Sequence, residues 1–313
     1  PLPAATINRC ICASCRKQVE TSSIQSARTA FAPGSMRVLA LSPGSLNQQL
    51  HRLPALAAAA VQLQAKLQVV CDPAQKAAWD LLPAIENVIP FTFNSTPSLA
   101  DWNNLLGHVR EQDFQICLNF AKGQPLNLML LMSHIPIRIA EKGFANTAIA
   151  IRGKGWSAQQ LGCYLHPIGL SLDADVFRLS IPKTSLQKVR DLQPTGEGPL
   201  LLLAPNGTNE DWPNQQWSTL PNTIRNQLPN LRSVSLPLDT PLIRRVAEVA
   251  CADVVLSSCP ITQLLAVYTG VSLVALGTPA DALPKRNNIH CLIPNSAELN
   301  ALSQQEVLSA LGF

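Results

Sequence analysis

Three short polar stretches, each directly after an apolar run, contain residue types that bind ligands. The first stretch, residues 43–48, follows the run at 36–41 and includes Gly44, Ser45, Asn47 and Gln48. Ser45 suits the N-cap of a helix, and the free N–H groups at a helix N-terminus attract anions. The alternative interpretation is a plain strand-to-helix turn, because the stretch lacks the Gly-x-Gly-x-x-Gly pattern of dinucleotide sites.

The other two stretches lie in the second half of the chain, after the apolar runs at 200–204 and 253–256. Their residues have small side chains, several of them polar, and are Asn206, Gly207, Thr208, Ser257, Ser258 and Cys259. Small polar residues at strand ends, the later set leading into a helix, suit an anion or a ribose. Simple caps and turns would use the same residues.

The elements that position these stretches follow from the hydrophobic pattern. Strands are expected at 36–41, 67–71, 87–93, 114–120, 135–140 and 148–151, with helices at 46–66, 73–85, 98–110 and 126–132. Apolar runs of strand length that alternate with helices predict a parallel sheet covered on both faces. Such a sheet meets its ligands at the carboxyl ends of its strands, which is where residues 43–48 would lie.

The same alternation restarts after residue 198. Strands are expected at 200–204, 233–236, 253–256, 272–276 and 289–293, helices at 214–228, 241–250 and 261–268, and a last helix capped by Asn295 and Ser296. Residues 181–198 are charged and rich in turn residues, as an interdomain linker is. The fold class is therefore α/β, with Rossmann-like domains at 36–180 and 199–313.

Composition indicates a folded protein without a broad nucleic-acid surface. Hydrophobic residues make up 47% of the 313 residues and charged residues 14%, which excludes general disorder. Residues 1–35 hold four basic residues and one acidic residue, which leaves 20 basic and 19 acidic residues for 36–313. A nearly neutral folded part does not suit nucleic acid. Because no apolar stretch reaches membrane-spanning length, we expect a cytoplasmic protein with at most peripheral membrane contact.

Residues 1–35 are rich in Ser, Thr, Ala and Arg, and we expect them to lie outside the fold. A transit peptide, which would make the location organellar, and sequence translated ahead of a true start at Met36 would both look like this. Cys10, Cys12 and Cys15 resemble half of a metal knuckle, but no second ligand pair follows at zinc spacing. The six later cysteines lie in or beside apolar runs, as buried thiols of a reducing compartment do, and no metal is expected.

A set of short motifs recurs in a fixed order from Met36 to about Leu292. The motifs are the opening strand followed by His51-Arg52-Leu53-Pro54, the pair Arg138-Ile139, Ala204-Pro205-Asn206-Gly207 before Trp212-Pro213 and Trp217, and residues 253–256 leading to 273–279. In this order they resemble the ADP-heptose:lipopolysaccharide heptosyltransferases of glycosyltransferase family 9. The resemblance implies the GT-B arrangement, in which two Rossmann-like domains face each other across a cleft. The first domain would hold the acceptor and the second the nucleotide sugar, with no further cofactor and no metal.

The polar signatures of that family are altered in this chain. When the Leu53-Pro54 positions are aligned, the family's Gly-Asp, whose carboxylate is its proposed catalytic base, falls on Asn47-Gln48. A carboxamide cannot take a proton at neutral pH. His51 lies one turn after Gln48 on the same helix face and is a candidate substitute base.

The second domain departs from the family in the same direction. Basic residues just before the family's Trp-Pro are replaced by Glu210-Asp211, which repel a diphosphate unless they point away. The family's Asp-Ser-Gly falls on 257–259, and its histidine falls near Thr262 or Gln263. The positions that the resemblance assigns to the nucleotide sugar are Asn206, Gly207, Thr208, Ser257, Ser258, Cys259, Thr262 and Gln263.

Two functions follow from these observations. The first is transfer of a heptose-like sugar from a nucleotide diphosphate sugar to lipopolysaccharide or another glycan. The second is a catalytically degenerate relative that binds a sugar nucleotide or a protein. A nicotinamide oxidoreductase is disfavoured because the glycine fingerprint is missing.

Overall fold

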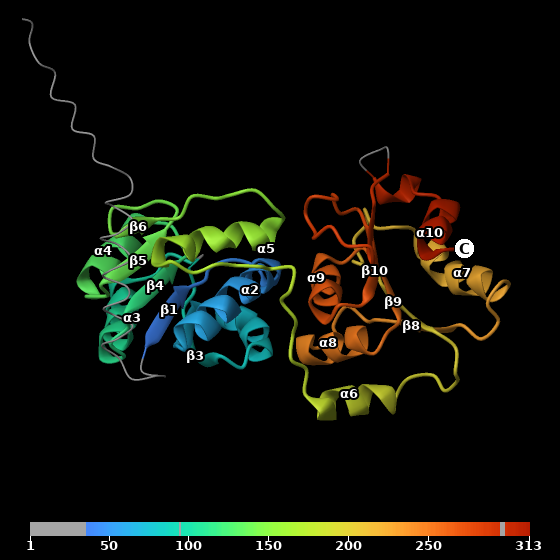
Figure 1. Ribbon diagram of the computed structural model, residues 1–313, viewed down its shortest axis with the longest axis horizontal. Coiled ribbons are helices and arrows are strands. Elements are labelled where there is room, and N and C mark those ends of the chain that lie inside the picture. The colour runs from blue at the N-terminus through green and yellow to red at the C-terminus, as the bar shows by residue number, and fades with distance from the viewer. Residues whose placement is uncertain (1–35, 94, 295–297) are drawn as a thin grey trace, which may run out of the picture.

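The computed structural model describes residues 36–93, 95–294 and 298–313. Two α/β lobes, each built on one parallel sheet, lie side by side (Figure 1). The expectations for residues 1–35, including the metal knuckle at Cys10, Cys12 and Cys15, fall outside the described residues. The cap expected at Asn295 and Ser296 falls outside them too.

The first sheet has six parallel strands in the order β3-β2-β1-β4-β5-β6. They are β1 (Arg37–Leu41), β2 (Lys66–Cys71), β3 (Ile85–Pro90), β4 (Ile116–Asn119), β5 (Ile137–Ala140) and β6 (Ala148–Ile149). Side chains that alternate along β1 belong to two different buried clusters. One face packs against α2 (Leu46–Leu63) and α5 (Ser157–Gln160), and the other against α3 (Leu99–Glu111) and α4 (Gln124–Met132). Burial on both faces explains the nearly continuous apolar runs.

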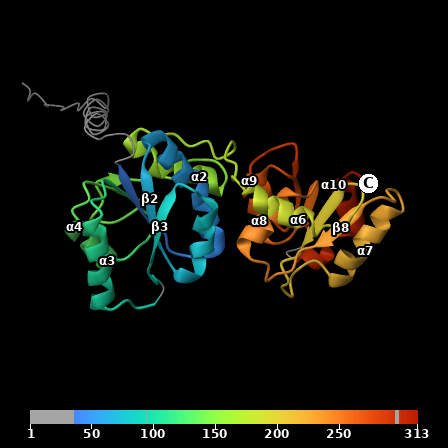
Figure 2. The same ribbon diagram turned by 90° about the horizontal axis from the view of Figure 1, so that it is seen from below.

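The second sheet has five parallel strands in the order β11-β10-β9-β7-β8. They are β7 (Leu200–Ala204), β8 (Arg232–Ser235), β9 (Val254–Ser257), β10 (Ser272–Leu276) and β11 (Ile289–Leu292). α7 (Asn214–Arg225) and α10 (Gln304–Leu311) cover the face that is turned away from the first lobe. α8 (Leu242–Ala250) and α9 (Pro260–Thr269) cover the face turned toward it (Figures 1 and 2).

The two lobes share one buried cluster, which runs from β1 and α2 through α9 to β7 and β10. Tyr268, fully buried near the end of α9, donates its hydroxyl hydrogen to the carbonyl oxygen of Leu50 in α2 at 3.0 Å. That carbonyl lies four residues before Pro54, which has no N–H to give it. The second lobe therefore satisfies a backbone group that proline leaves unpaired in the first.

The structure differs from the sequence expectations at several elements. Three short helices, α5, η2 (Leu161–Tyr164) and η3 (His166–Ile168), were not expected. The helix expected at 73–85 is the shorter 3₁₀ helix η1 (Pro73–Leu81), because β3 already starts at Ile85. The expected linker contains the helix α6 (Lys183–Arg190), which packs on α8, where Cys251 Sγ lies 3.8 Å from the carbonyl oxygen of Leu186. The last helix begins at Gln304, where Ser303 and Glu306 form the capping box.

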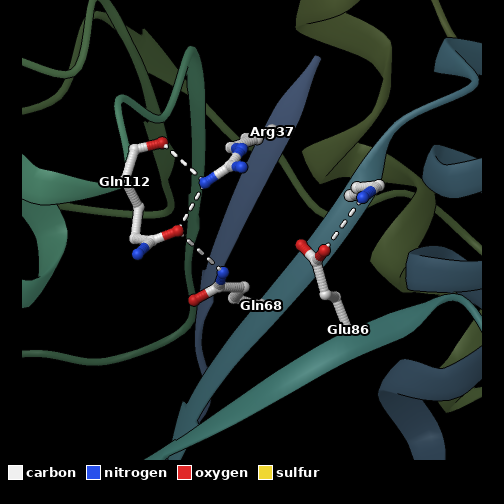
Figure 3. Close-up of polar contacts among 5 residues, drawn as sticks. Arg37, Gln68, Glu86 and Gln112 are labelled. Atoms are coloured by element: carbon white, nitrogen blue, oxygen red, sulfur yellow. Dashed lines mark hydrogen bonds and ion pairs between the residues drawn. The ribbon is translucent and has the colours of Figure 1, made fainter. Parts of the chain in front are cut away.

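The amino ends of the strands in the first sheet carry a polar cluster (Figure 3). The side-chain oxygen of Gln112 accepts hydrogen bonds from Arg37 and from Gln68, the latter at 3.3 Å. Lys66 pairs with Glu86 at 3.0 Å, and this hydrogen bond lowers the pKa of the Glu86 carboxyl. These contacts stabilise the edge of the sheet opposite to the ligand-binding edge expected for a parallel sheet.

The six cysteines of the described chain are free, and each is buried or half-buried. Burial raises the pKa of the Cys71 thiol to about 11 and of the Cys117 thiol to about 12, so both stay protonated at neutral pH. Among the described residues, no helix combines the length and apolar character needed to cross a bilayer.

Candidate functional site

Each sheet has one point where the strand order reverses, and the loops beside it are the expected ligand sites. In the first sheet this point lies between β1 and β4, and in the second between β7 and β9. The loops at the carboxyl ends of these strands are residues 42–45, 120–123, 205–213 and 258–259. Most of the residues singled out from sequence lie on or directly after these loops.

The loop after β1 is fixed by two side chains of α2 that the sequence analysis did not identify. Gln49, fully buried, donates from Nε2 to the carbonyl oxygens of Ser42, Pro43 and Gly44, each at 3.1 Å. Arg52 donates from Nη1 to Ser42 Oγ at 2.7 Å and to the carbonyl of Pro43. The loop therefore has a conformation set by the helix that follows it. The spacing of Gln49 and Arg52 with Leu53 and Leu56 puts both polar residues on the buried helix face, which is the signal that could have found them.

Arg52 is a buried cation at this loop. Its side chain lies over the Phe120 ring, with Cζ 4.9 Å from the ring centre, and burial lowers the pKa of its guanidinium to about 10. Every hydrogen bond found for Arg52 within the described residues comes from Nη1. The charge is thus desolvated without a carboxylate beside it, a state that an anionic ligand would stabilise.

Gln48, at the position of the family's base, is part of a helix cap. Its Oε1 accepts the backbone N–H of Ser45 at 3.0 Å, in the first turn of α2. The side chain folds over Gly44, where φ is +99° and an added Cβ would lie 1.8 Å from Gln48 Oε1. Asn47 lies beside it with a buried Oδ1 that has no hydrogen-bond donor among the described residues. The loop residues Gly44, Ser45, Asn47 and Gln48 are therefore brought together, but Gln48 is engaged locally.

His51 lies in the aromatic cluster between the lobes. Its ring is 6.5 Å from Trp156, which is 6.3 Å from Tyr268. Burial first, and the neighbouring charge of Arg52 second, lower the pKa of His51 to about 4. The imidazole is neutral at pH 7 but binds a proton weakly, so this environment does not favour the role of general base.

The loop after β7 already binds a negative charge of its own chain. Asp211 Oδ2 accepts the N–H of Asn206 at 2.6 Å and that of Gly207 at 2.9 Å, and Oδ1 accepts the N–H of Trp212 at 2.7 Å. The backbone N–H of Asn206 also donates to Ser258 Oγ at 2.9 Å, which joins the loops after β7 and β9. Asp211 thus points into the loop and occupies the backbone N–H groups that would otherwise be free for a phosphate.

Thr208 and Gly207 are exposed at the tip of this loop. Gly207 has φ +71°, and an added Cβ would lie 2.2 Å from Leu238. The left-handed backbone conformation favours glycine at this position, whereas the exposed Leu238 side chain could move to admit a Cβ.

The residues after β9 are largely satisfied within the protein. Ser257 Oγ donates to the carbonyl of Ala204 at 2.9 Å and accepts the N–H of Cys259 at 3.0 Å. Gln263, buried, donates to the carbonyl of Ser257 at 2.8 Å, and its Oε1 accepts from Thr278 Oγ1 at 2.6 Å. These side chains shape the start of α9 and leave little hydrogen-bonding capacity for a ligand.

Arg245 of α8 supplies a buried positive charge near the start of α9. Its Nη1 donates to Thr262 Oγ1 at 3.1 Å and lies 3.7 Å from Cys259 Sγ, and its Nη2 donates to the carbonyl of Leu238 at 2.7 Å. Arg245 was not identified from the sequence, although its spacing with Leu242, Val246 and Val249 places it on the apolar face of the helix. A cation beside a helix N-terminus favours an anion there.

The structure therefore forms two separate groups of the expected residues. Asn206 and Ser258 meet at the second sheet, and residues 44–48 meet at the first, but no hydrogen bond found among the described residues joins the two groups. The described part of the chain contains no cluster of three His, Cys, Asp or Glu side chains suited to a metal ion.

Solved structures share this fold at low sequence identity. A glycosyltransferase family 9 protein from Veillonella parvula superposes with a TM-score of 0.74 at 13% identity, over 90% of this chain and 97% of that chain. The E. coli ADP-heptose lipopolysaccharide heptosyltransferase II gives 0.68 at 13% identity, over 88% and 98%. The E. coli heptosyltransferase WaaC, solved with ADP-2-deoxy-2-fluoro heptose, gives 0.62 at 16% identity, over 88% and 99%.

No family model matches the sequence, and no curated protein matches it. The structural likeness confirms the expected fold: the chain has two parallel-sheet domains in the GT-B arrangement of the heptosyltransferases.

Proposed function

We propose that this protein binds a nucleotide diphosphate sugar without transferring the sugar by the mechanism of the heptosyltransferases. The observation that carries the proposal is the state of Gln48. The residue at the family's base position is a carboxamide held in a helix cap, 3.0 Å from the backbone nitrogen of Ser45. The nearest alternative, His51, is half-buried at the lobe interface with a pKa lowered to about 4.

Binding is supported by fold and by charge. One structural relative, the E. coli heptosyltransferase WaaC, was solved both with ADP and with ADP-2-deoxy-2-fluoro heptose, and the likeness covers 88% of this chain in each structure. In this protein the nucleotide would lie at the carboxyl ends of β7 and β9, beside Arg245 and the N-terminus of α9. An acceptor glycan would lie at residues 44–47 of the first domain, near Arg52.

A thermal-shift screen with ADP, UDP, GDP and their sugars tests this proposal. A nucleotide present at 100 times its Kd should add about 2.7 kcal/mol to the free energy of unfolding, which raises Tm by several degrees. Free ribose and inorganic phosphate at equal concentration serve as controls. The absence of any shift with every nucleotide at millimolar concentration would reject nucleotide binding.

Glycosyl transfer to a lipopolysaccharide or other glycan is the second candidate. It is favoured by the presence of both domains along almost the full length of the relatives, because nucleotide binding by itself needs only one. Nucleotide release from ADP-heptose, UDP-sugars and GDP-sugars with a glycan acceptor measures it directly. Acceptor-dependent release by the wild type would overturn the binding-only proposal, and loss of that release in His51→Ala would identify His51 as the base.

A further inference from the structure

Exposed apolar side chains are concentrated at one end of the first domain. Six of the thirteen large apolar side chains that are exposed in the described chain lie within residues 128–151, a segment of 24 residues. They are Leu128, Leu131, Met132, Phe144, Ile149 and Ile151. Single exposed apolar residues are common on protein surfaces, whereas a group of this size marks an interaction surface.

The six residues come from three neighbouring elements. Leu128, Leu131 and Met132 lie on α4, and Phe144 lies on the loop between β5 and β6. That loop packs on α4, because Asn127 Oδ1 accepts the N–H of Ala145 at 3.4 Å, and Leu131 is one helical turn after Asn127. Ile149 and Ile151 follow on the edge strand β6 and just after it.

The surface lies away from the second domain. Figures 1 and 2 show α4 at the end of the first lobe that is farthest from α8 and α9, and β6 is the last strand of its sheet. Neither the second sheet nor its helices cover it. We call the six apolar residues, together with the exposed Lys142 and Lys154, the α4–β6 face.

The segment that contains the α4–β6 face is basic, whereas the rest of 36–313 has more acidic than basic residues. Residues 114–172 hold five basic residues and one acidic residue, which leaves 15 basic and 18 acidic residues for the rest of 36–313. The single acid, Glu141, pairs with Arg152 at 2.5 Å and so ties the segment after β6 to the start of the β5–β6 loop. Lys122, Lys142 and Lys154 are exposed.

We propose that the α4–β6 face docks on the surface of an anionic lipid bilayer. Exposed Phe, Leu and Ile side chains enter the boundary between headgroups and acyl chains, while lysines around them contact lipid phosphates. Binding of this kind needs no membrane-spanning helix. The inference uses none of the residues assigned to the nucleotide or the acceptor.

The positive charge of the face favours a lipid surface over two other binding partners, a second copy of the chain and residues 1–35. A second copy of the chain would bring the same positive charge to the contact and be repelled, and β6, with two residues, is too short for strand addition. Residues 1–35 also carry a net positive charge, with four basic residues against one acidic, and so do not complement the face. An anionic lipid bilayer has both negatively charged headgroups and an apolar interior that can take up the exposed side chains.

The test is sedimentation of the full chain with large unilamellar vesicles. Vesicles of phosphatidylcholine with about a third phosphatidylglycerol should bind the protein at least tenfold more strongly than phosphatidylcholine alone, and high salt should release it. The double variants Lys142→Glu/Lys154→Glu and Phe144→Ser/Ile151→Ser should each lower the partition coefficient at least about tenfold.

Matched controls change the same residue types elsewhere. Lys183→Glu/Lys188→Glu on exposed positions of α6 and Leu192→Ser, at a side chain that is 70% exposed, should bind vesicles as the wild type does. All substitutions are at exposed positions, and an unchanged Tm checks that the variants fold.

Three results would overturn the proposal. The first is that the wild type does not bind anionic vesicles. This result is expected if the face binds an acidic protein and not a lipid surface. The second is equal loss of binding in the α6 variant, or binding that survives in both α4–β6 variants, which would assign it to overall charge or to residues 1–35. The third is concentration-dependent self-association that Phe144→Ser/Ile151→Ser abolishes.

Discussion

At the scale of single residues, local hydrogen bonding decides what each polar side chain does. Gln48 occupies the position where the resembling family has a carboxylate, yet its oxygen accepts the N–H of Ser45 as the third residue of a capping box does. In α3 the same arrangement is made by an acid, because Asp101 accepts the N–H of Ser98 at 2.8 Å. An aspartate would therefore fit at position 48 as a cap.

We expect Gln48→Asp to be at least as stable as the wild type, because it keeps the cap and adds a negative charge at the positive end of α2. Gln48→Ala should lose about 1 kcal/mol, or roughly 2 °C in Tm. Thermal unfolding followed by circular dichroism measures both. Equal stability of all three proteins would show that the cap contributes nothing.

His51 gives a prediction for pH dependence. Its folded-state pKa of about 4 lies below the ordinary value of 6.5, so the unfolded chain binds more protons between these two pH values. The free energy of unfolding should therefore rise with pH across this window, and the stability should be lost as pH falls from 6.5 toward 4. In His51→Gln this part of the slope should vanish. Urea unfolding of both proteins at several pH values gives the difference, and parallel curves would contradict the lowered pKa.

At the scale of elements, each strand-to-helix loop is closed by side chains from its own neighbourhood. Gln49 and Arg52 hold the loop after β1, and Asp211 holds the loop after β7. Asp211 satisfies the N–H groups of Asn206, Gly207 and Trp212, which in the proposed site would face a phosphate. The loop thus contains an internal competitor for an anionic ligand.

The variant Asp211→Ala tests whether the Asp211 carboxylate competes with an anionic ligand for these N–H groups. Without ligand the variant should be less stable by about 1–2 kcal/mol, because three N–H groups lose a charged acceptor. Phosphate or ADP should stabilise the variant more than the wild type, since the N–H groups are then free. Thermal shifts of both proteins across a phosphate titration measure this. Glu210→Ala, at the exposed neighbouring residue, is the control, and identical phosphate responses would show that the loop does not receive an anion.

At the scale of the whole molecule, the two domains are joined by a shared buried cluster and by one hydrogen bond with a clear origin. Pro54 leaves the carbonyl of Leu50 without a donor in its own helix, and Tyr268 of the second domain supplies one at 3.0 Å. One contact of the interface therefore pairs a hydroxyl of one domain with a carbonyl that a proline leaves unpaired in the other.

A double-mutant cycle tests this pairing. Tyr268→Phe should cost about 1–3 kcal/mol, because a buried carbonyl loses its donor. Pro54→Ala restores the N–H within α2, so Tyr268→Phe should cost clearly less in that background. Denaturant unfolding of the four proteins gives the coupling. Additive effects would show that the hydroxyl and the proline act independently.

The boundary between the domains stays a prediction. The helix α6 limits the stretch within 181–198 where we expect cleavage. Because α6 is a hydrogen-bonded helix that packs on α8, the irregular, exposed residues after it are the part of the segment 181–198 that a protease can cleave most easily. Digestion with a glutamate-specific protease should cut first at Glu197, which is exposed. Mass spectrometry of the earliest fragments identifies the site, and an earlier cut within residues 36–180 would contradict the division.

The sequence by itself determined the alternation of strands and helices and hence the two parallel sheets. That information is local, because a strand buried on both faces must be apolar throughout, and turn residues mark its ends. The strands of both sheets were placed within a few residues, including β7 and β10 with their full bounds, whereas the short helices α5 and α6 were not predicted. The loops at the points where the strand order reverses could be found for the same reason.

Only the tertiary structure decided what the polar residues in those loops do. Whether Gln48 caps a helix, whether Asp211 turns into its loop, and whether His51 meets Trp156 depend on atoms brought together by folding. The buried cations Arg52 and Arg245, and the gathering of exposed apolar residues on α4 and β6, depend on how helices pack on sheets. Periodicity in a sequence gives the face of an element, but the partner of that face is set by long-range contacts that no local pattern encodes.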